Sequence, residues 1–411
     1  MKFYRERIGY FFTKSLKNLG FNGIINLMKQ RVVVAMSGGV DSSVAAALLK
    51  QAGFDVVGIM MKFWHAPRSF SEVGKDDSTN RCCSLESEKL ARLVAKKIGI
   101  PFYVINVEKE FKKKVVDYFL TEYKKGNTPN PCVVCNKEIK FGFLIKKALS
   151  LGADYVATGH YVRTSLANQT FSAAQPVFPG PFASKKFIGS LQSLSPRLFK
   201  GKDKEKDQSY FLWQLSQEQI KHVMFPVGGY TKPEVRKLAK KFKLPTAETP
   251  ESQEVCFVKD TTNNFLERYL KTKPGKITDA KGKVVGQHNG LWFYTIGQRH
   301  GLELEQGPWY VTGKDFKKNI LVVSKDKKDL LRKEARLIHV NLINPQKVPG
   351  PKGYPVEVKI RYKSNLAKAK IIKFQKDIIK IIFQKPQQAI TPGQSAVFYK
   401  GEELLGGGVF E

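Results

Sequence analysis

Three cysteines in two short motifs are the residues whose types and spacing indicate the most specific chemistry. Cys132 and Cys135 stand in the run Thr-Pro-Asn-Pro-Cys-Val-Val-Cys-Asn-Lys-Glu-Ile-Lys-Phe. Two prolines fix an extended lead-in and Asn136 is a good N-cap for the following helix, so Cys135 is expected just outside a helix N-terminus. The helix dipole, with Lys137 and Lys140 close by, is expected to lower the pKa of that thiol. The pattern therefore predicts a nucleophile or a metal ligand.

The third candidate, Cys256, lies far along the chain in the run Ser-Gln-Glu-Val-Cys-Phe, and folding can return it to the first pair. Cys82 and Cys83 lie near a predicted helix start without comparable surroundings, so we interpret them as structural. An odd total of five cysteines indicates reduced thiols in the cytoplasm rather than a disulfide framework.

A glycine pair stands where the first predicted strand, 31–36, passes into a predicted helix, 42–52, through the run Ser-Gly-Gly-Val-Asp-Ser. Gly38 and Gly39 allow the backbone to approach a ligand, and the helix N-terminus favours phosphate. No Gly-Lys-Ser/Thr follows, which argues against the P-loop of γ-phosphoryl transfer. The pattern instead resembles the pyrophosphate loop of enzymes that split ATP into AMP and pyrophosphate to adenylate a carbonyl oxygen.

Strands and helices alternate from residue 31 to about 160. We predict strands at 31–36, 56–63, 102–107 and 155–158, and helices at 42–52, 84–99, 109–125 and 136–151. Such alternation predicts βαβ crossovers, and hence an α/β fold with a parallel, doubly wound sheet. Ligands gather at the carboxyl ends of such strands. The nucleotide is therefore expected beside the glycine pair, Met61 and Gly159.

The rest of the chain divides by pattern. A polar insertion covers 164–198, a helix with a basic face covers 231–244, and β-rich sequence with Gly-containing turns begins near 275. Short alternating strands after about 336 suggest a small β-barrel. The predicted parts are a basic extension at 1–30, a catalytic domain at 31–225, a β-rich central domain at 226–335 and a C-terminal barrel at 336–411.

The net charge of +34, from 70 Lys and Arg against 36 Asp and Glu, suggests a polyanionic partner such as RNA. No apolar run approaches the about 18 residues that indicate a membrane span, so we expect a soluble protein. We also predict a cytoplasmic location and a monomer. Residues 1–30 allow three interpretations: an organellar presequence, an RNA-contacting arm, or an upstream start-site artefact, because Met28 leads into the first strand.

Seven ordered motifs resemble the bacterial tRNA-specific 2-thiouridylase (MnmA) family over about 31–411. Besides the glycine loop and the Asn-Pro-x-x-x-Cys run, they are Thr-Gly-His-Tyr at 158–161, Lys-Asp-Gln-Ser-Tyr-Phe-Leu at 206–212, Ser-Gln-Glu-Val-Cys-Phe at 252–257, Tyr-Thr-Ile-Gly-Gln-Arg at 294–299 and Thr-Pro-Gly-Gln at 391–394. The resemblance implies that ATP adenylates the C2 carbonyl oxygen of the wobble uridine in tRNA. A persulfide, received from a sulfur carrier, then delivers sulfur and displaces AMP.

The resemblance also implies roles for single residues. The nucleotide is expected to contact Ala35, Met36, Ser37, Gly38, Gly39, Val40, Asp41, Ser42, Met61 and Gly159. Cys135 is the implied nucleophile and Cys256 the implied persulfide carrier. The target base is expected at Asn130, Pro131 and Cys132, and the tRNA at His160, Lys206, Asp207, Gln208, Arg361, Tyr362 and Gln394. From its charge at the loop, Asp41 is also predicted to help hold Mg²⁺ on the pyrophosphate.

Cys132 departs from the family pattern, in which better-known members have Asp, so any carboxylate role is absent here. Two alternatives stay open. Cys132, Cys135 and Cys256 could bind a 4Fe–4S cluster, with one iron left to carry an exogenous sulfide. Alternatively, Cys132 is a third redox thiol while the other two carry out persulfide chemistry. Structural zinc is disfavoured because it takes four ligands.

Two other functions fit parts of the sequence. One is a tRNA-binding protein that keeps the fold without the chemistry, which the basic charge and the missing Asp would allow. The other is a pyrophosphate-loop synthetase that adenylates a small substrate. The intact glycine loop, with Cys135 and Cys256, argues against the first. The second has no use for a thiol pair, a basic helix and a barrel.

Overall fold

The computed structural model describes residues 30–66, 84–165, 195–250, 255–258, 261–345, 353–375 and 378–411. Several predictions fall wholly or largely outside these ranges. They concern the extension at 1–30, the structural interpretation of Cys82 and Cys83, the insertion at 164–198, and the first residues of the Ser-Gln-Glu-Val-Cys-Phe run.

The valine-rich strand β1 (Arg31–Ala35) lies in the middle of a five-stranded parallel sheet. The other strands are β2 (Asp55–Lys62), β3 (Phe102–Asn106), β4 (Tyr155–Ala157) and β7 (Val223–Met224), in the order β3-β2-β1-β4-β7. Val32 and Val34 pack in one hydrophobic cluster and Val33 in another, because the strand is buried on both faces. The predicted α/β class is confirmed.

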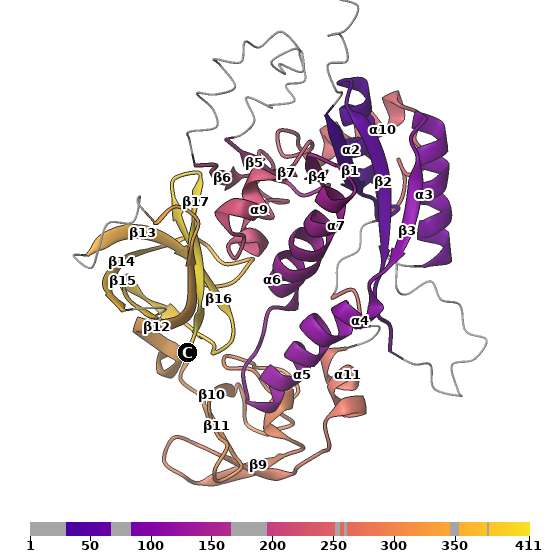
Figure 1. Cartoon of the computed structure of the whole chain (residues 1–411). Helices are drawn as coiled ribbons and strands as arrows, with labels where there is room; N and C mark the ends of the chain where they lie inside the picture. The colour runs from indigo at the N-terminus through magenta and orange to yellow at the C-terminus, as the bar shows by residue number, and fades with distance from the viewer. Residues whose placement is uncertain are drawn as a thin grey trace, which may run out of the picture.

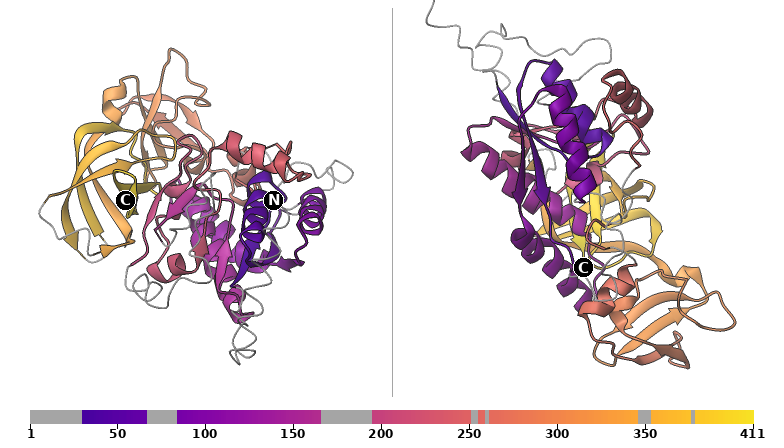
Figure 2. Two further views of the ribbon diagram at one scale, coloured as in Figure 1. Left: turned by 90° about the horizontal axis from the view of Figure 1, so that it is seen from above. Right: turned by 90° about the vertical axis from the view of Figure 1, so that its right-hand side faces the viewer.

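Helices cover both faces of this sheet (Figures 1 and 2). One face carries α2 (Val40–Gln51), α3 (Leu85–Ile98) and α10 (Lys232–Lys241). The other carries two longer helical runs. The first consists of α4 (Glu108–Phe111), the π-helical η2 (Lys112–Val116) and α5 (Asp117–Lys124), and the second of α6 (Pro131–Cys135), the π-helical η3 (Asn136–Phe143) and α7 (Leu144–Ser150).

The helix that carries the cysteine pair begins five residues earlier than predicted. Asn130, not Asn136, is its N-cap, and the Asn130 side chain accepts a hydrogen bond from the backbone N–H of Val133 at 3.4 Å. Pro131 occupies the first turn, where its missing N–H costs nothing and its fixed φ suits the helix. The prediction that Cys135 lies outside the helix N-terminus is therefore wrong, and Cys132 takes the first-turn position.

Helix α10 packs in the first domain. The helix begins with a capping box, in which the Thr231 N–H donates to Glu234 Oε2 at 2.6 Å. Val235 and Ala239 are buried in the same cluster as Val44 of α2. The boundary that we predicted at residue 225 thus falls inside the first packing unit, because the buried face of α10 completes the cover of the sheet.

The central domain begins with α11 (Thr262–Tyr269) and contains a four-stranded sheet. Its strands are β8 (Gly275–Thr278), β9 (Val284–His288), β10 (Tyr310–Asp315) and β11 (Ile320–Ser324), in the order β10-β11-β8-β9. The short helices η5 (Leu291–Phe293) and η6 (Lys327–Leu330) flank β10 and β11 in the chain. This mixed sheet confirms the β-rich character expected of the central region.

The C-terminal strands form the predicted barrel. They are β12 (Leu331–Leu342), β13 (Tyr354–Lys359), β14 (Ala367–Gln375), β15 (Ile378–Gln388), β16 (Ser395–Lys400) and β17 (Glu403–Phe410), and pairing of β12 with β17 closes the sheet. A hairpin of β5 (Val162–Thr164) and β6 (Leu198–Lys200) from the first domain extends the edge of β17. The linking helices η4 (Ser209–Leu212) and α9 (Gln217–Lys221) follow this hairpin.

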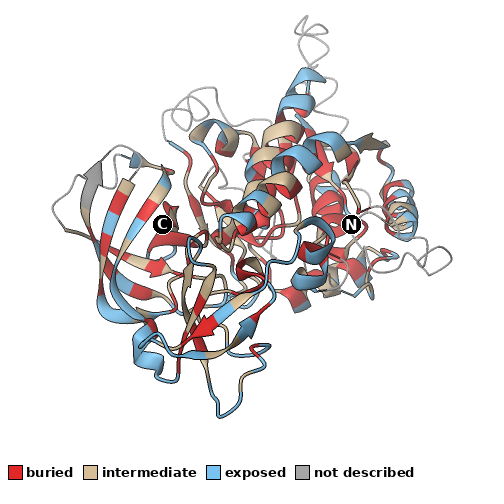
Figure 3. Cartoon of the chain, turned by 90° about the horizontal axis from the view of Figure 1, so that it is seen from below, coloured by how far each residue is buried: buried red, intermediate tan, exposed pale blue. Residues whose placement is uncertain are grey.

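Buried positions line the inner faces of the helices and the barrel strands, while the outer faces are exposed (Figure 3). Within the described ranges, no helix has the length and apolar character needed to cross a membrane.

Candidate functional site

Hydrogen bonds from its own serine side chains fix the conformation of the glycine loop after β1. The Ser37 N–H donates to Ser42 Oγ at 3.2 Å, and both Ser42 Oγ and Ser43 Oγ donate to the Gly39 carbonyl, at 3.1 and 2.8 Å. Gly38 has φ +75°, and a Cβ there would lie 2.4 Å from the carbonyl oxygen of Ser87 in α3. The loop therefore requires glycine for its conformation and for its fit against α3.

This loop lies at the point where the strand order reverses, between β1 and β4, which is where doubly wound sheets bind ligands. Gly159, just beyond β4, touches the loop: a Cβ there would lie 2.7 Å from the carbonyl carbon of Asp41 and from the amide nitrogen of Ser42. The structure thus brings Gly159 to the predicted phosphate site. Met61 at the end of β2 is buried with only 7% exposure.

The carboxylate of Asp41 is engaged by two side chains that our sequence analysis did not assign. Lys232 Nζ lies 2.8 Å from each of its oxygens, and the Tyr161 hydroxyl donates to Oδ1 at 2.7 Å. In this conformation Lys232 neutralises the carboxylate that was predicted to help hold Mg²⁺. The sequence did contain one indication of this ion pair. A lysine in the first turn of a helix opposes the helix dipole, so a negatively charged partner is favourable there.

A loop of alternating charge supports this network. Asp203 Oδ2 accepts a hydrogen bond from the Lys232 N–H at 2.8 Å, which caps α10 from the loop at 200–208. Gln208 exchanges two bonds with Tyr161: its Oε1 accepts from the Tyr161 N–H at 3.0 Å, and its N–H donates to the Tyr161 carbonyl at 3.2 Å. Both partners of Asp41 are therefore anchored to the same loop.

The three cysteines differ in exposure: Cys132 is exposed, Cys135 is buried and Cys256 is half-buried. Cys135 belongs to the large hydrophobic cluster on the helical face of the sheet, and Cys256 packs against that cluster. In the described part of the chain, no group of three or more His, Cys, Asp or Glu side chains is arranged to hold a metal ion. The three thiols therefore do not fit a 4Fe–4S cluster as they stand here.

Phe257 holds the Cys256 segment against the first domain. Its ring makes edge-on contacts with Phe111 at 5.8 Å and with Phe119 at 5.3 Å between centroids. These rings belong to the helical run α4-η2-α5, and α6 packs against η2. The segments that carry Cys135 and Cys256 thus both pack against the run α4-η2-α5, as the predicted return of Cys256 to the first cysteine pair requires.

Two of the residues predicted to contact tRNA are buried. His160 is 8% exposed between the rings of Phe141 and Phe225, and its Nδ1 lies 2.8 Å from Thr158 Oγ1. Asp207 is 4% exposed and accepts hydrogen bonds from the N–H groups of Gly201 and Ser209. In this conformation neither is placed for direct contact with RNA, because each satisfies buried backbone or packs in the core.

The other predicted tRNA residues are partly exposed. Lys206 and Gln208 lie on the charged loop, while Arg361, Tyr362 and Gln394 lie in the barrel domain. Gln394 donates to the Thr128 carbonyl, two residues before Asn130. Burial lowers the pKa of the Arg361 guanidinium and raises that of the Tyr362 hydroxyl. Tyr362 packs on Phe211 with 4.5 Å between ring centroids.

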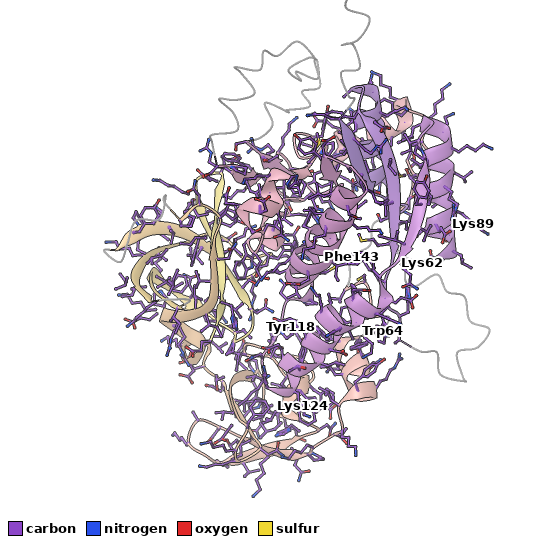
Figure 4. The ribbon with its side chains drawn as sticks, viewed as in Figure 1. Lys62, Trp64, Lys89, Tyr118, Lys124 and Phe143 are labelled. Carbon is purple, nitrogen blue, oxygen red and sulfur yellow. The ribbon has the colours of Figure 1, made fainter. Side chains whose placement is uncertain are left out.

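Lysines stand on several elements of the first domain. Figure 4 labels Lys62 at the end of β2, Lys89 on α3 and Lys124 on α5. Lys62 also forms an ion pair with Glu88 at 3.1 Å. The large positive net charge of the chain suits a polyanion.

A glycine loop and a helix N-terminus at the switch point of a parallel sheet, without a P-loop lysine, define a nucleotide-binding enzyme of the ATP-pyrophosphatase type. Three family models match in order: the tRNA methyl transferase HUP domain over 30–260, the tRNA methyl transferase PRC-barrel domain over 263–325 and the aminomethyltransferase beta-barrel domain over 332–410. The chain belongs to the tRNA-specific 2-thiouridylase (MnmA) family.

Three curated relatives carry that assignment. The tRNA-specific 2-thiouridylase MnmA 2 of Thermoanaerobacter sp. (strain X514) is 44% identical over 93% of this chain and 98% of its own length. The MnmA proteins of Carboxydothermus hydrogenoformans and Thermus thermophilus are 42% and 43% identical, over 93% and 92% of this chain and 98% and 94% of their own lengths. The chain is thus a member of an enzyme family, and the resemblance seen in its motifs is confirmed.

Proposed function

We propose that this enzyme uses ATP to activate the C2 carbonyl oxygen of the wobble uridine in tRNA, and then replaces that oxygen by sulfur. The observation that carries the proposal is the combination of a pyrophosphate loop with two cysteines fastened to one helical run. The loop supplies activation of an oxygen, and the thiols supply a route for sulfur.

In the first step the uridine O2 attacks the α-phosphorus of ATP. The O2–P bond forms, the bond from the α-phosphorus to the bridging oxygen breaks, and pyrophosphate leaves with that electron pair while the N3 proton is lost to solvent. Backbone N–H groups at the start of α2 and the turn at Gly38 and Gly39 are suited to receive the pyrophosphate. Lys232 balances the charge of Asp41 beside it.

In the second step the terminal sulfur of a persulfide on Cys256 attacks C2, and AMP leaves with the electron pair of the C2–O bond. The Cys135 thiolate then attacks the Cys256 sulfur and breaks the S–S bond, which leaves the transferred sulfur on C2. The product is a disulfide between Cys135 and Cys256, which a thiol reductant returns to the dithiol. A sulfur-carrier protein or another persulfide donor reloads Cys256.

A second route would use a 4Fe–4S cluster on the three cysteines as the sulfide carrier, and it would first require the three thiols to move together, because the described part of the chain holds no group of three ligands arranged for a metal. What favours it is the third thiol, which stands in the first turn of the same helix as Cys135. Iron content and the absorption spectrum of protein purified without oxygen separate the routes. Active protein without iron supports the persulfide route, whereas activity proportional to bound iron supports the cluster.

The activation step has its own test. Purified protein with tRNA is expected to convert ATP into AMP and pyrophosphate, with no ADP, and omission of tRNA is expected to remove most of this turnover. ADP and phosphate as products would contradict the adenylation step. Binding of tRNA without any nucleotide turnover would favour the non-catalytic RNA-binding function, and tRNA-independent turnover would favour a small-molecule synthetase.

A further inference from the structure

The lead segment, residues 126–130, connects α5 to the helix that carries Cys132 and Cys135. Figure 1 shows this connection passing between the barrel and the central sheet. Its last residue, Asn130, is the N-cap of α6. Any displacement of the lead segment therefore moves the start of the cysteine helix.

The barrel domain holds the middle of the lead segment through its backbone. The Thr128 N–H donates to the Pro392 carbonyl at 2.8 Å, and Gln394 Nε2 donates to the Thr128 carbonyl at 2.7 Å. Gly393 has φ +89°, and a Cβ there would lie 2.8 Å from Asn127 Cβ and 2.9 Å from the Thr128 nitrogen. The Thr-Pro-Gly-Gln turn thus fits against the lead segment with no room for a side chain.

The central domain holds the same segment from another direction. Thr128 Oγ1 lies 3.2 Å from Thr295 Oγ1, and Lys314 Nζ donates to the Gly126 carbonyl at 3.0 Å. A Cβ at Gly126 would lie 2.1 Å from the ring of Phe316. Burial at this contact lowers the pKa of Lys314 to about 8.

Arg361 joins the barrel turn at 391–394 to the central-domain turn at 294–298. Its Nη2 atom donates to the Ala389 carbonyl at 2.9 Å and to Thr391 Oγ1 at 2.8 Å on the barrel side, and to the Ile296 carbonyl at 3.3 Å on the central side. A Cβ at Gly297 would lie 2.5 Å from Ala389 Cβ. The turns therefore pack as one unit.

The last residue of the lead segment, Asn130, is also linked to the barrel. Tyr210, fully buried, donates its hydroxyl to the Ser395 carbonyl at 3.0 Å and is also hydrogen-bonded to the side chain of Asn130. The N-cap residue is thus linked through Tyr210 to the barrel strand that follows Gln394.

We propose that Gln394 and Thr295 are positioning residues, which hold the lead segment so that the cysteine helix begins at Pro131 and keeps Cys135 in its buried position. The Thr-Pro-Gly-Gln and Tyr-Thr-Ile-Gly-Gln turns then act on the thiols through Thr128. RNA that binds the barrel or the central domain can therefore shift the cysteine helix through the same contacts to Thr128. This role rests on the proposed function for its catalytic meaning, but the positioning itself is a property of the tRNA-free protein.

This proposal differs from the expectation that Gln394 touches tRNA directly. The amide N–H₂ that could meet RNA is the group bonded to the Thr128 carbonyl. A direct contact predicts weaker RNA binding with unchanged thiols in the tRNA-free protein. A positioning role predicts altered thiols before any tRNA is added.

The test measures alkylation of each cysteine by iodoacetamide in the tRNA-free full chain, followed by peptide mass spectrometry. In Gln394→Leu we expect Cys135 to react about fivefold faster than in the unchanged protein, the equilibrium effect of one lost hydrogen bond of about 1 kcal/mol. Cys256, which lies outside both the lead segment and the cysteine helix, provides the internal reference for reagent access. Gln387→Leu is the matched control, because the Gln387 amide bonds only within its own strand, to Lys385 and Pro386, among the contacts described.

Thr295→Val is the second variant, since it removes only a hydroxyl and keeps the volume. It is expected to raise the Cys135 rate in the same direction, and the double variant with Gln394→Leu to show coupling. Equal Cys135 rates in Gln394→Leu, Thr295→Val and the control would overturn the positioning role, while a raised tRNA Kd alone would assign Gln394 to RNA contact. Absence of tRNA thiolation by the unchanged protein would instead contradict the proposed function.

Discussion

Lys232 Nζ lies 2.8 Å from both carboxylate oxygens of Asp41, although the two residues are 191 positions apart in the chain. The lysine side chain is 10% exposed and the aspartate 31%. We predict that Lys232→Met raises the KM for ATP at least tenfold. An unpaired carboxylate would then face the phosphates, and like charges about 6 Å apart repel by roughly 3 kcal/mol at an effective dielectric constant of about 20.

The matched control is Lys237→Met, on the exposed side of the same helix. It removes one positive charge from the protein without touching Asp41, so pyrophosphate release assays should give the KM of the unchanged protein. The same KM for both variants would show that the ion pair has no part in ATP use.

Gly159→Ala is expected to reduce ATP turnover at least tenfold with little loss of folded protein. The added methyl group would lie 2.7 Å from the backbone of Asp41 and Ser42, so the loop would have to shift. Gly313→Ala serves as the control, because its Cβ would meet its nearest atom at an ordinary 3.7 Å. Pyrophosphate release is measured beside thermal unfolding, and unimpaired turnover in Gly159→Ala would separate this glycine from the nucleotide site.

His160 is expected to act as a neutral core residue. Burial, and secondarily the charge of Lys140, hold its pKa well below the ordinary value of 6.5. The unfolded chain therefore binds a proton more readily than the folded one, so stability falls as pH drops below about 6.5 and continues to fall toward the folded-state pKa. We predict that the Tm of His160→Asn depends less on pH between 7.5 and 5.5 than that of the unchanged protein. Parallel curves would contradict the buried, neutral state.

The affinity for tRNA is expected to fall steeply with salt, by at least tenfold between 50 and 200 mM, because Lys and Arg contacts to phosphate release counterions. Lys206→Ala should lower the slope of log Kd against log salt by about one, the effect of one lost phosphate contact. Filter binding or fluorescence anisotropy measures both slopes. A flat salt dependence would argue against the basic surface as the RNA-binding face.

Local signals in the sequence were sufficient for much of the fold. The buried run at β1, the glycine pair and the following helix are all determined by neighbours in the chain, as are the alternating strands of the barrel. The helix start at Asn130 was missed because Asn130 and Asn136 both satisfy the N-cap preference, and only packing of the helix decides between them. Pro131, which we predicted to be part of an extended lead-in, lies in the first helical turn.

Contacts between distant segments account for the other differences. No local pattern pairs Lys232 with Asp41, or Gln394 with Thr128 across 266 positions. The burial of His160 and Asp207 likewise depends on Phe225 and on backbone groups that fold over them. A motif can therefore identify a residue without revealing whether it meets the ligand or supports the residue that does.

Sulfur incorporation in Cys135→Ala and Cys256→Ala tests the central claim most directly. Each variant is incubated with tRNA, ATP and a persulfide donor, and 2-thiouridine and pyrophosphate are measured in the same sample. We predict that both variants still release pyrophosphate in the presence of tRNA but form less than about a hundredth of the 2-thiouridine, because activation depends on the loop and sulfur transfer depends on the thiols. Formation of 2-thiouridine at the unchanged rate in both variants would contradict the account.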